Sequence, residues 1–524
     1  MTTLTLALVA AALALALSAR FRVASAPLAI GAGVALSALG APIDSEMLLE
    51  GLLLAATFLV FAVGTQLERQ AIARYRSAAI GIAALYLGVT AAIAMAVARL
   101  VDLDGITVVY LVLALASSST LLVVDLLRHR RQSFDPFGRL TTGVAVTQDV
   151  VVIFAIGLFG PALLGATELG LAGLTIAGLL ALTWALSRFV APAALVRGTL
   201  SDEEELLIVL AVLFLFVGLA WGGGLPIVLG AYLAGVVFSR FPVGGVVRGH
   251  IASFSDFFTV LFFALLGAFV GIPKPQEFWA EAILIVTVLL LRPVLLLPIL
   301  RRMQLTVKAS MQSMTMLAQA GEVGLIVALV AVGQEHVGED LVSTVAVVVM
   351  VTMALAPMLS SARMVSWLTH AYPQRWPAPT PGRRGHVIVI GAGDGGRAVL
   401  AQLEPLAVDV IVIDDDPVAL DALTSRGVTT LRGDGTDTSI LHQAEAEHAA
   451  AIVSTMRDLH DNEQLLARVD GPSVLMRVFS TEDAARMREL GGVPVIESEL
   501  ATSRFLEWYE GAAQHRITTP GSGH

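Results

Sequence analysis

The stretch TTGVAVTQDVVVIF at 141–154 places a glutamine and an aspartate, Gln148 and Asp149, inside an apolar segment. No other charge occurs between Arg139 and Glu168, which leaves enough apolar residues for the roughly 20 that a membrane-crossing helix needs. A carboxylate near the middle of such a helix costs roughly 3 kcal/mol on insertion scales and usually marks an ion or proton path. A purely structural aspartate, capped by neighbouring hydroxyls, is the alternative. The sequence is organised around Asp149 as a candidate functional carboxylate.

The composition indicates a membrane protein joined to a soluble domain. Of 524 residues, 56% are hydrophobic and only 15% are charged, and the mean hydropathy is +0.80. Apolar segments separated by short charged loops fill residues 1–370, and the remainder has the composition of a soluble domain. The absence of cysteine excludes disulfides, thiolate metal sites and cysteine catalysis. The net charge of -10 gives no electrostatic basis for binding nucleic acid.

Residues 1–370 are predicted to form a transmembrane domain of about thirteen segments embedded in the lipid bilayer. The first apolar run resembles a signal peptide, but Arg20 and Arg22 follow it instead of preceding it, so a first transmembrane helix is favoured. Glycines before the short ninth segment indicate a tilted or partly irregular helix. The segments are expected at 3–19, 26–41, 47–66, 78–98, 106–127, 139–160, 169–192, 204–220, 225–238, 252–271, 278–300, 309–333 and 341–366.

Loop charges predict the orientation of these segments. Arginines and Lys308 concentrate in the loops that follow odd-numbered segments, whereas the opposite loops carry only Arg99 and Lys274 among basic residues. Because the basic face of a membrane protein is cytoplasmic, the N-terminus is expected outside and the C-terminus inside. The protein is therefore expected to be a multi-pass protein of the plasma or inner membrane.

The pattern changes after a linker rich in proline and arginine at 371–385. HVIVIGAGDGGRAVLAQL predicts a strand, a glycine turn and a helix, and VDVIVIDDDP predicts a second strand. The alternation of strands and helices predicts a doubly wound parallel sheet of the Rossmann type over 386–510, followed by a flexible tail at 511–524. Further strands are expected at 428–431, 450–454, 473–478 and 493–496.

The glycine turn is a candidate nucleotide site. Gly391, Gly393 and Gly396 fit the pattern G-x-G-x-x-G, in which glycines allow a tight turn and close approach of a phosphate to a helix N-terminus. Asp414 ends the next strand, where an acid bonds ribose hydroxyls. The alternative is a vestigial Rossmann domain that serves only in dimerisation.

Three further features interrupt the apolar segments. A hydroxyl cluster, Ser117 to Thr120, occurs in the fifth segment, where hydroxyls satisfy a broken helix or coordinate a cation. Packing of small residues between helices is the alternative. Glu322 is a second acid deep in an apolar segment, and Arg292 is a cation there that is expected to pair with an acid on a facing helix.

Taken together, these motifs resemble the monovalent cation:proton antiporter superfamily, and most of all its Kef-type potassium efflux branch with a C-terminal RCK (TrkA-N-type) domain. The resemblance covers nearly the whole chain and implies a membrane all-α transporter of NhaA/NapA-like fold, with inverted repeats and crossed broken helices. The motifs that carry it are SSST, TQD, GLPIVLGAYLAGVVFS, SFSDFFTVLFFALLGAFVGI, LLLRP, LAQAGEVG, HVIVIGAGDGG, VIVIDDDP and LRGDGTDTSILHQA.

The resemblance also implies roles for individual residues. Asp149 matches the acid that carries proton and cation alternately, and Gln148 matches the neutral residue of the Kef-type pair. Arg292 stands where lysine is frequent, and an arginine is expected to be a fixed countercharge because it hardly deprotonates. The first and second crossing helices are matched at Ser118, Ser119 and Thr120 and at Gln319, Gly321 and Glu322, and the nucleotide pocket at Gly391, Gly393, Gly396, Asp414, Asp434 and Thr436.

The implied activity is electroneutral exchange of K⁺ for H⁺ by an elevator mechanism, regulated by AMP, ATP or NAD(H) on the RCK domain. Implied partners are a second copy of the chain, through both domains, and an ancillary regulatory subunit. A Na⁺/H⁺ antiporter and a nucleotide-gated K⁺ channel are the alternatives, although no TVGYG-like filter is present. An NAD-dependent enzyme is a third, supported by the Rossmann motif alone. No RCK C-terminal lobe is expected, so regulation by glutathione is left open.

Overall fold

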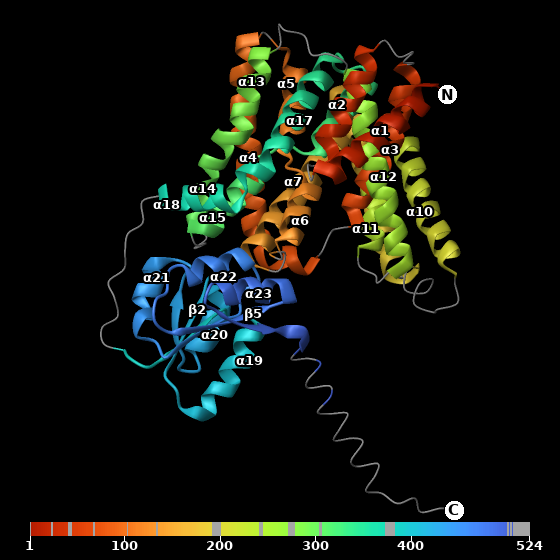
Figure 1. The fold of residues 1–524 in the computed structure, drawn as a ribbon. Helices are drawn as coiled ribbons and strands as arrows, with labels where there is room; N and C mark the ends of the chain where they lie inside the picture. The colour runs from red at the N-terminus through yellow and green to blue at the C-terminus, as the bar shows by residue number, and fades with distance from the viewer. Residues whose placement is uncertain are drawn as a thin grey trace, which may run out of the picture. The chain divides into compact units, whose positions relative to one another are not determined.

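The computed structural model falls into two compact units (Figure 1). The first comprises Met1–Leu127, Phe137–Gln304 and Ser310–Val365; the second comprises Arg128–Pro136, Leu305–Ala309 and Ser366–His524. Most of the expected linker and the whole expected tail lie outside the described residues. The structure describes residues 2–21, 25–39, 45–65, 69–101, 103–130, 132, 135–190, 201–239, 245–270, 278–302, 307–371, 383–499, 502 and 506.

The first unit is built from helices. Two of them continue into short π-helical turns, η1 (Leu186–Val190) after α8 and η2 (Thr287–Leu291) between α13 and α14. The helices are α1 (Thr2–Phe21), α2 (Ser25–Ala38), α3 (Ser45–Thr65), α4 (Arg69–Val101), α5 (Gly105–Ala116), α6 (Thr120–His129), α7 (Pro136–Leu164), α8 (Ala166–Ala185), α10 (Asp202–Gly222), α11 (Ile227–Phe238), α12 (Gly245–Val270), α13 (Phe278–Val286), α14 (Arg292–Arg302), α15 (Val307–Met316), α16 (Glu322–Gly333) and α17 (Asp340–Leu359).

Each predicted membrane segment coincides with one helix or with consecutive helices. Within the described residues, nine helical stretches are long and apolar enough to cross a membrane, and four apolar helices of 10–17 residues are shorter. The number of crossings therefore stays a prediction, as does the inverted repeat. The expected last segment, 341–366, was too long, because α17 ends at Leu359, with Ser360 as its C-cap, and the amphipathic α18 (Ala362–Ala371) follows as a separate helix.

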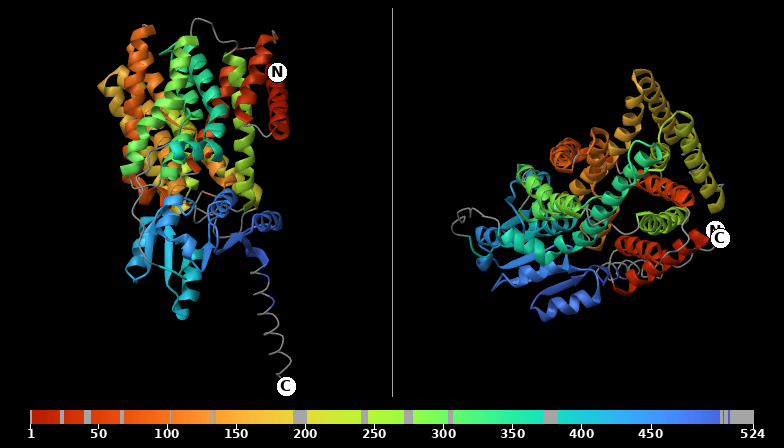
Figure 2. Two further views of the ribbon diagram at one scale, coloured as in Figure 1. Left: turned by 60° about the vertical axis from the view of Figure 1, so that its left-hand side comes forward. Right: turned by 90° about the horizontal axis from the view of Figure 1, so that it is seen from above.

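Glycines let the helices of the first unit approach closely. A Cβ on Gly33 of α2 would collide with the backbone of α12 near Gly267, and a Cβ on Gly64 of α3 would collide with α11 near Gly235. Such small-residue contacts are typical of helices in membranes. By contrast, α8 and α10 lie along the outer edge of this unit (Figure 2), and only 22% of the apolar window of either helix is buried. These two helices therefore offer apolar surface to lipid or to another protein.

The second unit contains a six-stranded parallel sheet in the order β3-β2-β1-β4-β5-β6. The side chains of β1 alternate: Ile388 and Ile390 pack on one face and Val389 on the other, against α19 and α20. All six predicted strands and the doubly wound order are confirmed. The elements are β1 (Val387–Ile390), α19 (Asp394–Leu403), β2 (Val410–Asp414), α20 (Pro417–Thr424), β3 (Thr429–Arg432), α21 (Thr438–Gln443), β4 (Ala451–Ser454), α22 (Leu459–Leu466), β5 (Ser473–Val478), α23 (Thr481–Glu489) and β6 (Val493–Ile496).

Candidate functional site

Two helical segments of the first unit are broken in the middle. Between α5 and α6 the chain is extended at Ser117, with φ -87° and ψ 148°. Between α15 and α16 it is extended at Gly321, with φ -97° and ψ 166°. The predicted interruption at the hydroxyl cluster is confirmed, as is the break of the second segment before Glu322.

The two breaks contact each other directly. The Gly321 amide donates to the Ser117 carbonyl at 3.1 Å, and the Ser118 hydroxyl donates to the Leu317 carbonyl at 3.2 Å. Space is tight, since a Cβ on Gly321 would lie 2.8 Å from the Ser118 carbonyl carbon, and a Cβ on Gly324 would collide with the Ala114 carbonyl. Irregular backbone in an apolar interior requires such partners. The breaks thus satisfy each other's polar groups.

The glutamine and aspartate of α7 lie against the first break. The Thr120 hydroxyl donates to Asp149 Oδ2 at 2.6 Å, and the Ser118 amide donates to Gln148 Oε1 at 3.1 Å. All four of these residues are at most 2% exposed. The structure therefore brings together residues that the sequence predicted for one site from separate segments.

The oxygen atoms at the place where the two breaks meet suit a dehydrated monovalent cation. Asp149 Oδ1, Ser117 Oγ and Gln319 Oε1 are buried and have no hydrogen-bond partner among the described residues. Glu322, the first residue of α16, is buried and acts electrostatically on Asp149. Oxygen ligands of this kind replace a cation's hydration shell. The described residues contain no group of three His, Cys, Asp or Glu able to hold a metal ion.

Arg292 differs from its expected role. Its guanidinium lies 4.4 Å from the centre of the Tyr86 ring, and no carboxylate of the described residues forms an ion pair with it. The Tyr86 hydroxyl in turn donates to the Leu317 carbonyl at 3.2 Å. The expected pairing with an acid on a facing helix is thus wrong for the described part of the chain. Arg292 supports the second break through Tyr86, a residue that sequence reasoning missed because a tyrosine in an apolar run gives no signal.

The predicted nucleotide turn lies at the carboxyl end of β1. Gly391 has φ +102°, a conformation that favours glycine, and its amide donates to the Ile413 carbonyl at 2.8 Å. A Cβ on Gly396 would collide with the Gly391 carbonyl, and Gly393 directly precedes α19. Asp414, at the end of β2, accepts the Ala392 amide at 2.5 Å. The turn, the helix and the acid therefore have the predicted arrangement.

A second part of this edge follows β3. One oxygen of Asp434, Oδ1, accepts the Thr436 amide at 2.8 Å and the Thr436 hydroxyl at 2.7 Å. The Gly433 amide donates to the Asp414 carbonyl at 3.0 Å, which brings the two acidic turns together. Lys308 also reaches this edge, and the sequence identified it only as a basic loop residue. Turns after adjacent parallel strands are where such sheets bind ligands.

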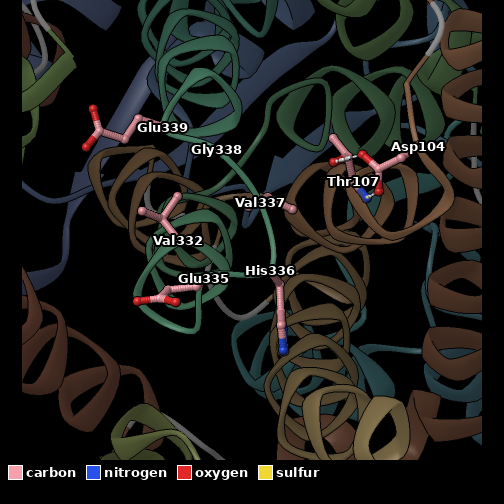
Figure 3. A pocket seen from close by; sticks show the side chains of 8 residues that line it. All are labelled: Asp104, Thr107, Val332, Glu335, His336, Val337, Gly338 and Glu339. Carbon is pink, nitrogen blue, oxygen red and sulfur yellow. Dashed lines mark hydrogen bonds between the residues drawn. The ribbon is translucent and has the colours of Figure 1, made fainter.

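A pocket of about 510 Å³ opens at the far end of α5 and α16 (Figure 3). Behind it, the buried Tyr110 hydroxyl lies 2.6 Å from His336 Nδ1. Asp104 caps α5 and bonds to Thr107. The acids that line the pocket, Asp104, Glu335 and Glu339, come from two loops on the side opposite to the basic face. The sequence predicted no pocket there. Its lining residues are Asp104, Thr107, Val332, Glu335, His336, Val337, Gly338 and Glu339.

The geometry defines an ion-transporting membrane protein, with a buried carboxylate between two broken helices, joined to a dinucleotide-type domain. The family model described as "Sodium/hydrogen exchanger, transmembrane" matches residues 5–361, and the chain belongs to this family. The TrkA-N domain model matches residues 387–498. The protein is therefore a cation/proton antiporter of the membrane with a regulatory TrkA-N domain. The family is one of transporters, in agreement with the expectation that the chain is not an enzyme.

Of three solved structures that resemble parts of the chain, one has a TM-score above 0.5 and shows the same fold. The sodium proton antiporter MjNhaP1 from Methanocaldococcus jannaschii is 14% identical, with a TM-score of 0.55, covering 70% of this chain and 97% of its own. The TrkA-N domain of inner membrane protein ybaL from Escherichia coli is 20% identical, with a TM-score of 0.23, over 24% of this chain and 97% of its own. The GsuK channel bound to NAD is 16% identical, with a TM-score of 0.21, over 42% and 41%.

Proposed function

We propose that the protein exchanges K⁺ for H⁺ electroneutrally, with Asp149 binding the cation and the proton in turn. The observation that carries this proposal is the carboxylate itself: one oxygen of Asp149 accepts the Thr120 hydroxyl at 2.6 Å, and the other is buried without a partner among the described residues. A cation or a proton satisfies that second oxygen, but not both at once. Na⁺ in place of K⁺ would use the same chemistry.

Neighbouring groups determine the stoichiometry. Gln148 is neutral and is bonded to the Ser118 amide at 3.1 Å, so it adds no second titrating charge. Glu322 begins α16, where the helix N-terminus stabilises a carboxylate. In the proposed cycle Glu322 keeps one protonation state, so that only Asp149 switches and one proton is exchanged for one cation.

The transport movement that we propose is of the elevator type. The crossing, α5 to α7 with α15 and α16, moves as one body against a dimerising scaffold formed by the early and middle helices. The hydrogen bonds between the two breaks support motion as one body because they join the segments through backbone groups. The apolar surface of α8 and α10 supports contact with lipid or with a second copy of the chain. Residues 1–370 form the transporter domain in this proposal.

The TrkA-N domain is proposed to bind a nucleotide at the edge formed by Gly391, Gly393, Gly396, Asp414, Asp434 and Thr436. Bound AMP, ATP or NAD(H) would shift the population of active transporter. Support comes from the tight glycine turn and from the acids after β2 and β3. The domain is proposed to lie in the cytoplasm of the cell, as a pair in the homodimer, with an ancillary subunit as a further partner. Titration calorimetry on the whole protein ranks the three nucleotides.

Flux in proteoliposomes containing a pH dye tests the assignment of Asp149. The wild type should move protons when K⁺ is added, unaffected by clamping the voltage, and Asp149→Asn should abolish this movement because it cannot carry the proton. Glu281→Gln is the matched control, a buried carboxylate on α13 that should retain exchange. A response to Na⁺ alone would mean that the transported cation is Na⁺ and not K⁺. Exchange by Asp149→Asn, or a conductance without proton movement, would contradict the proposal.

A further inference from the structure

Lys308 forms a buried ion cluster within the second unit. The boundary between the units passes through α15: residues 305–309 belong to the second unit, and the rest of the helix belongs to the first. Lys308, in the first turn of α15, is therefore part of the second unit. Its Nζ is 2.5 Å from Asp461 Oδ1 and 3.4 Å from Asp434 Oδ2. The three side chains are each only 16% exposed. A buried charge pair is costly to break because the charge left behind is uncompensated.

The ion cluster shares a carboxylate with the proposed nucleotide site. Asp434 uses Oδ1 to accept Thr436 and presents Oδ2 to Lys308. Both oxygens of Asp434 are therefore engaged, and a ligand that bonds to Asp434 has to share one of them or displace one of these contacts. A ligand at this edge consequently alters the position or the strength of the Lys308 contact.

Lys308 is also continuous with the transport site. α15 runs from Val307 to Met316, about 15 Å at the rise of an α-helix. The next residue, Leu317, accepts hydrogen bonds from Ser118 and Tyr86. Because a hydrogen-bonded helix resists compression, a shift at Lys308 reaches the second break directly through the chain.

A second hydrogen bond ties α15 to the helix of the functional carboxylate. The Thr141 hydroxyl on α7 donates to the Ser313 hydroxyl at 3.0 Å, and both residues are buried. Asp149 lies eight residues further along α7, as their numbers show. Movement of α15 therefore acts both on the second break and on α7, the helix that carries Asp149.

We infer that Lys308 is the residue through which nucleotide at the TrkA-N domain controls the broken segment that carries Glu322. The inference rests on the proposed function and names its regulatory contact. The ion cluster holds the start of α15, and nucleotide binding beside Asp434 and Thr436 changes that hold. Because coupling between two sites is reciprocal, the state of the crossing also changes nucleotide affinity.

Charge effects agree with this geometry. Burial lowers the pKa of Lys308, but the carboxylates of Asp434 and Asp461 outweigh burial and raise this pKa above its usual value. Burial raises the pKa of Asp434, but Lys308 and the bonds from Thr436 outweigh burial and hold it below the usual value. Both partners are therefore charged at neutral pH.

The test compares Lys308→Gln with Lys308→Arg and with Arg302→Gln, which removes an exposed cation at the end of α14. Exchange in proteoliposomes is measured without nucleotide and with AMP, ATP or NADH, and binding is measured by calorimetry on the same full-length proteins. Coupling between sites is typically about 5–150-fold, so Lys308→Gln should lose at least about fivefold of the nucleotide response while still exchanging cations. The arginine variant and the control should keep the response.

The outcomes separate the two proposals. A wild type without cation/proton exchange contradicts the proposed function. A wild type that exchanges but shows no response to any nucleotide contradicts the regulatory proposal and this inference together. A full response in Lys308→Gln contradicts this inference alone. If Lys308→Gln does not fold, Asp461→Asn decides, because it removes one of the two carboxylates that pair with Lys308 and should weaken the response, whereas a full response in Asp461→Asn would contradict the inference.

Discussion

The Thr120 hydroxyl is the only hydrogen-bond donor to Asp149 among the described residues, at 2.6 Å. A hydrogen bond to a charged group contributes about 1.5–3 kcal/mol, so its loss should weaken the cation-bound state relative to the protonated one. Thr120→Ala is expected to raise the KM for the cation about tenfold or more, and Thr120→Ser should restore it. Steady-state exchange at several cation concentrations measures this effect.

Thr147→Ala is the control for this prediction. Thr147 is on α7 near Asp149, but its hydroxyl donates to the Gly143 carbonyl of its own helix at 2.6 Å. Its removal should leave the KM near the wild-type value. An equal increase in KM for Thr120→Ala and Thr147→Ala would mean that the hydroxyl next to Asp149 has no special role.

Single residues also show what the sequence could and could not predict about the site. Asp149, Gln148 and Glu322 were predicted because a polar residue inside an apolar run needs an explanation. Tyr86 and Lys308 were missed for the opposite reason. A tyrosine among apolar residues and a lysine in a basic loop are ordinary, and only the contacts made in the folded chain distinguish them.

At the scale of elements, the close approach of the two broken segments depends on Gly324. A Cβ there would collide with the Ala114 carbonyl of α5, so Gly324→Ala must separate α16 from α5 or distort one of them. Overpacking of this kind costs about 1–3 kcal/mol. We expect a lower melting temperature in detergent and a large loss of exchange, measured by thermal unfolding and by flux.

A glycine with open surroundings provides the control. Gly173 on α8 has nothing within 4 Å of the position that a Cβ would occupy. Alanine is a better helix former than glycine by about 1 kcal/mol, so Gly173→Ala should leave the melting temperature unchanged or raise it. Equal melting temperatures for Gly324→Ala and Gly173→Ala would show that the segments tolerate separation.

Elements were predicted to different degrees. All six strands of the sheet were predicted because short β-branched runs alternate with helical patterns there. The break at Ser117 was predicted because hydroxyls interrupt an apolar run. The break at Ser360 was not, although Ser360 and Ser361 interrupt the apolar run there, because the apolar Met364 and Val365 beyond them were assigned to the same segment.

On the scale of the whole molecule, the ion cluster at Lys308 predicts that the proposed regulation depends on pH. Burial raises the pKa of Asp461 to about 6, although Lys308 lowers it. The other charged groups that act on Asp461 are Asp434, Asp458 and Asp135. Because this pKa exceeds the usual 3.8, the folded protein binds a proton at Asp461 more tightly than the unfolded chain. Charging Asp461 therefore lowers stability as the pH rises through about 6, while it completes the contact with Lys308.

Acidification of the solution around the second unit should consequently weaken the hold on α15. Below about pH 6, Asp461 becomes neutral, and of the two carboxylates that form ion pairs with Lys308 within the described residues, Asp434 alone stays charged. We expect the ratio of exchange rates with and without nucleotide to decrease as the pH falls from 7.5 to 5.5. This decrease should have a Hill coefficient of about 1 and a midpoint near pH 6. The ratio removes the direct effect of pH on Asp149, because both rates are measured at the same pH.

Asp461→Asn isolates the group that titrates. This variant should have, at pH 7.5, the weak nucleotide response that the wild type has at pH 5.5, and its response should no longer vary near pH 6. Asp458→Asn is the comparison, since it removes a nearby negative charge without removing a partner of Lys308, and it should move the transition to lower pH because one repulsive charge is gone. A transition near pH 6 that persists in Asp461→Asn would assign the titration to another member of the acidic group, with Asp135, whose pKa burial raises to about 7, as the next to be replaced.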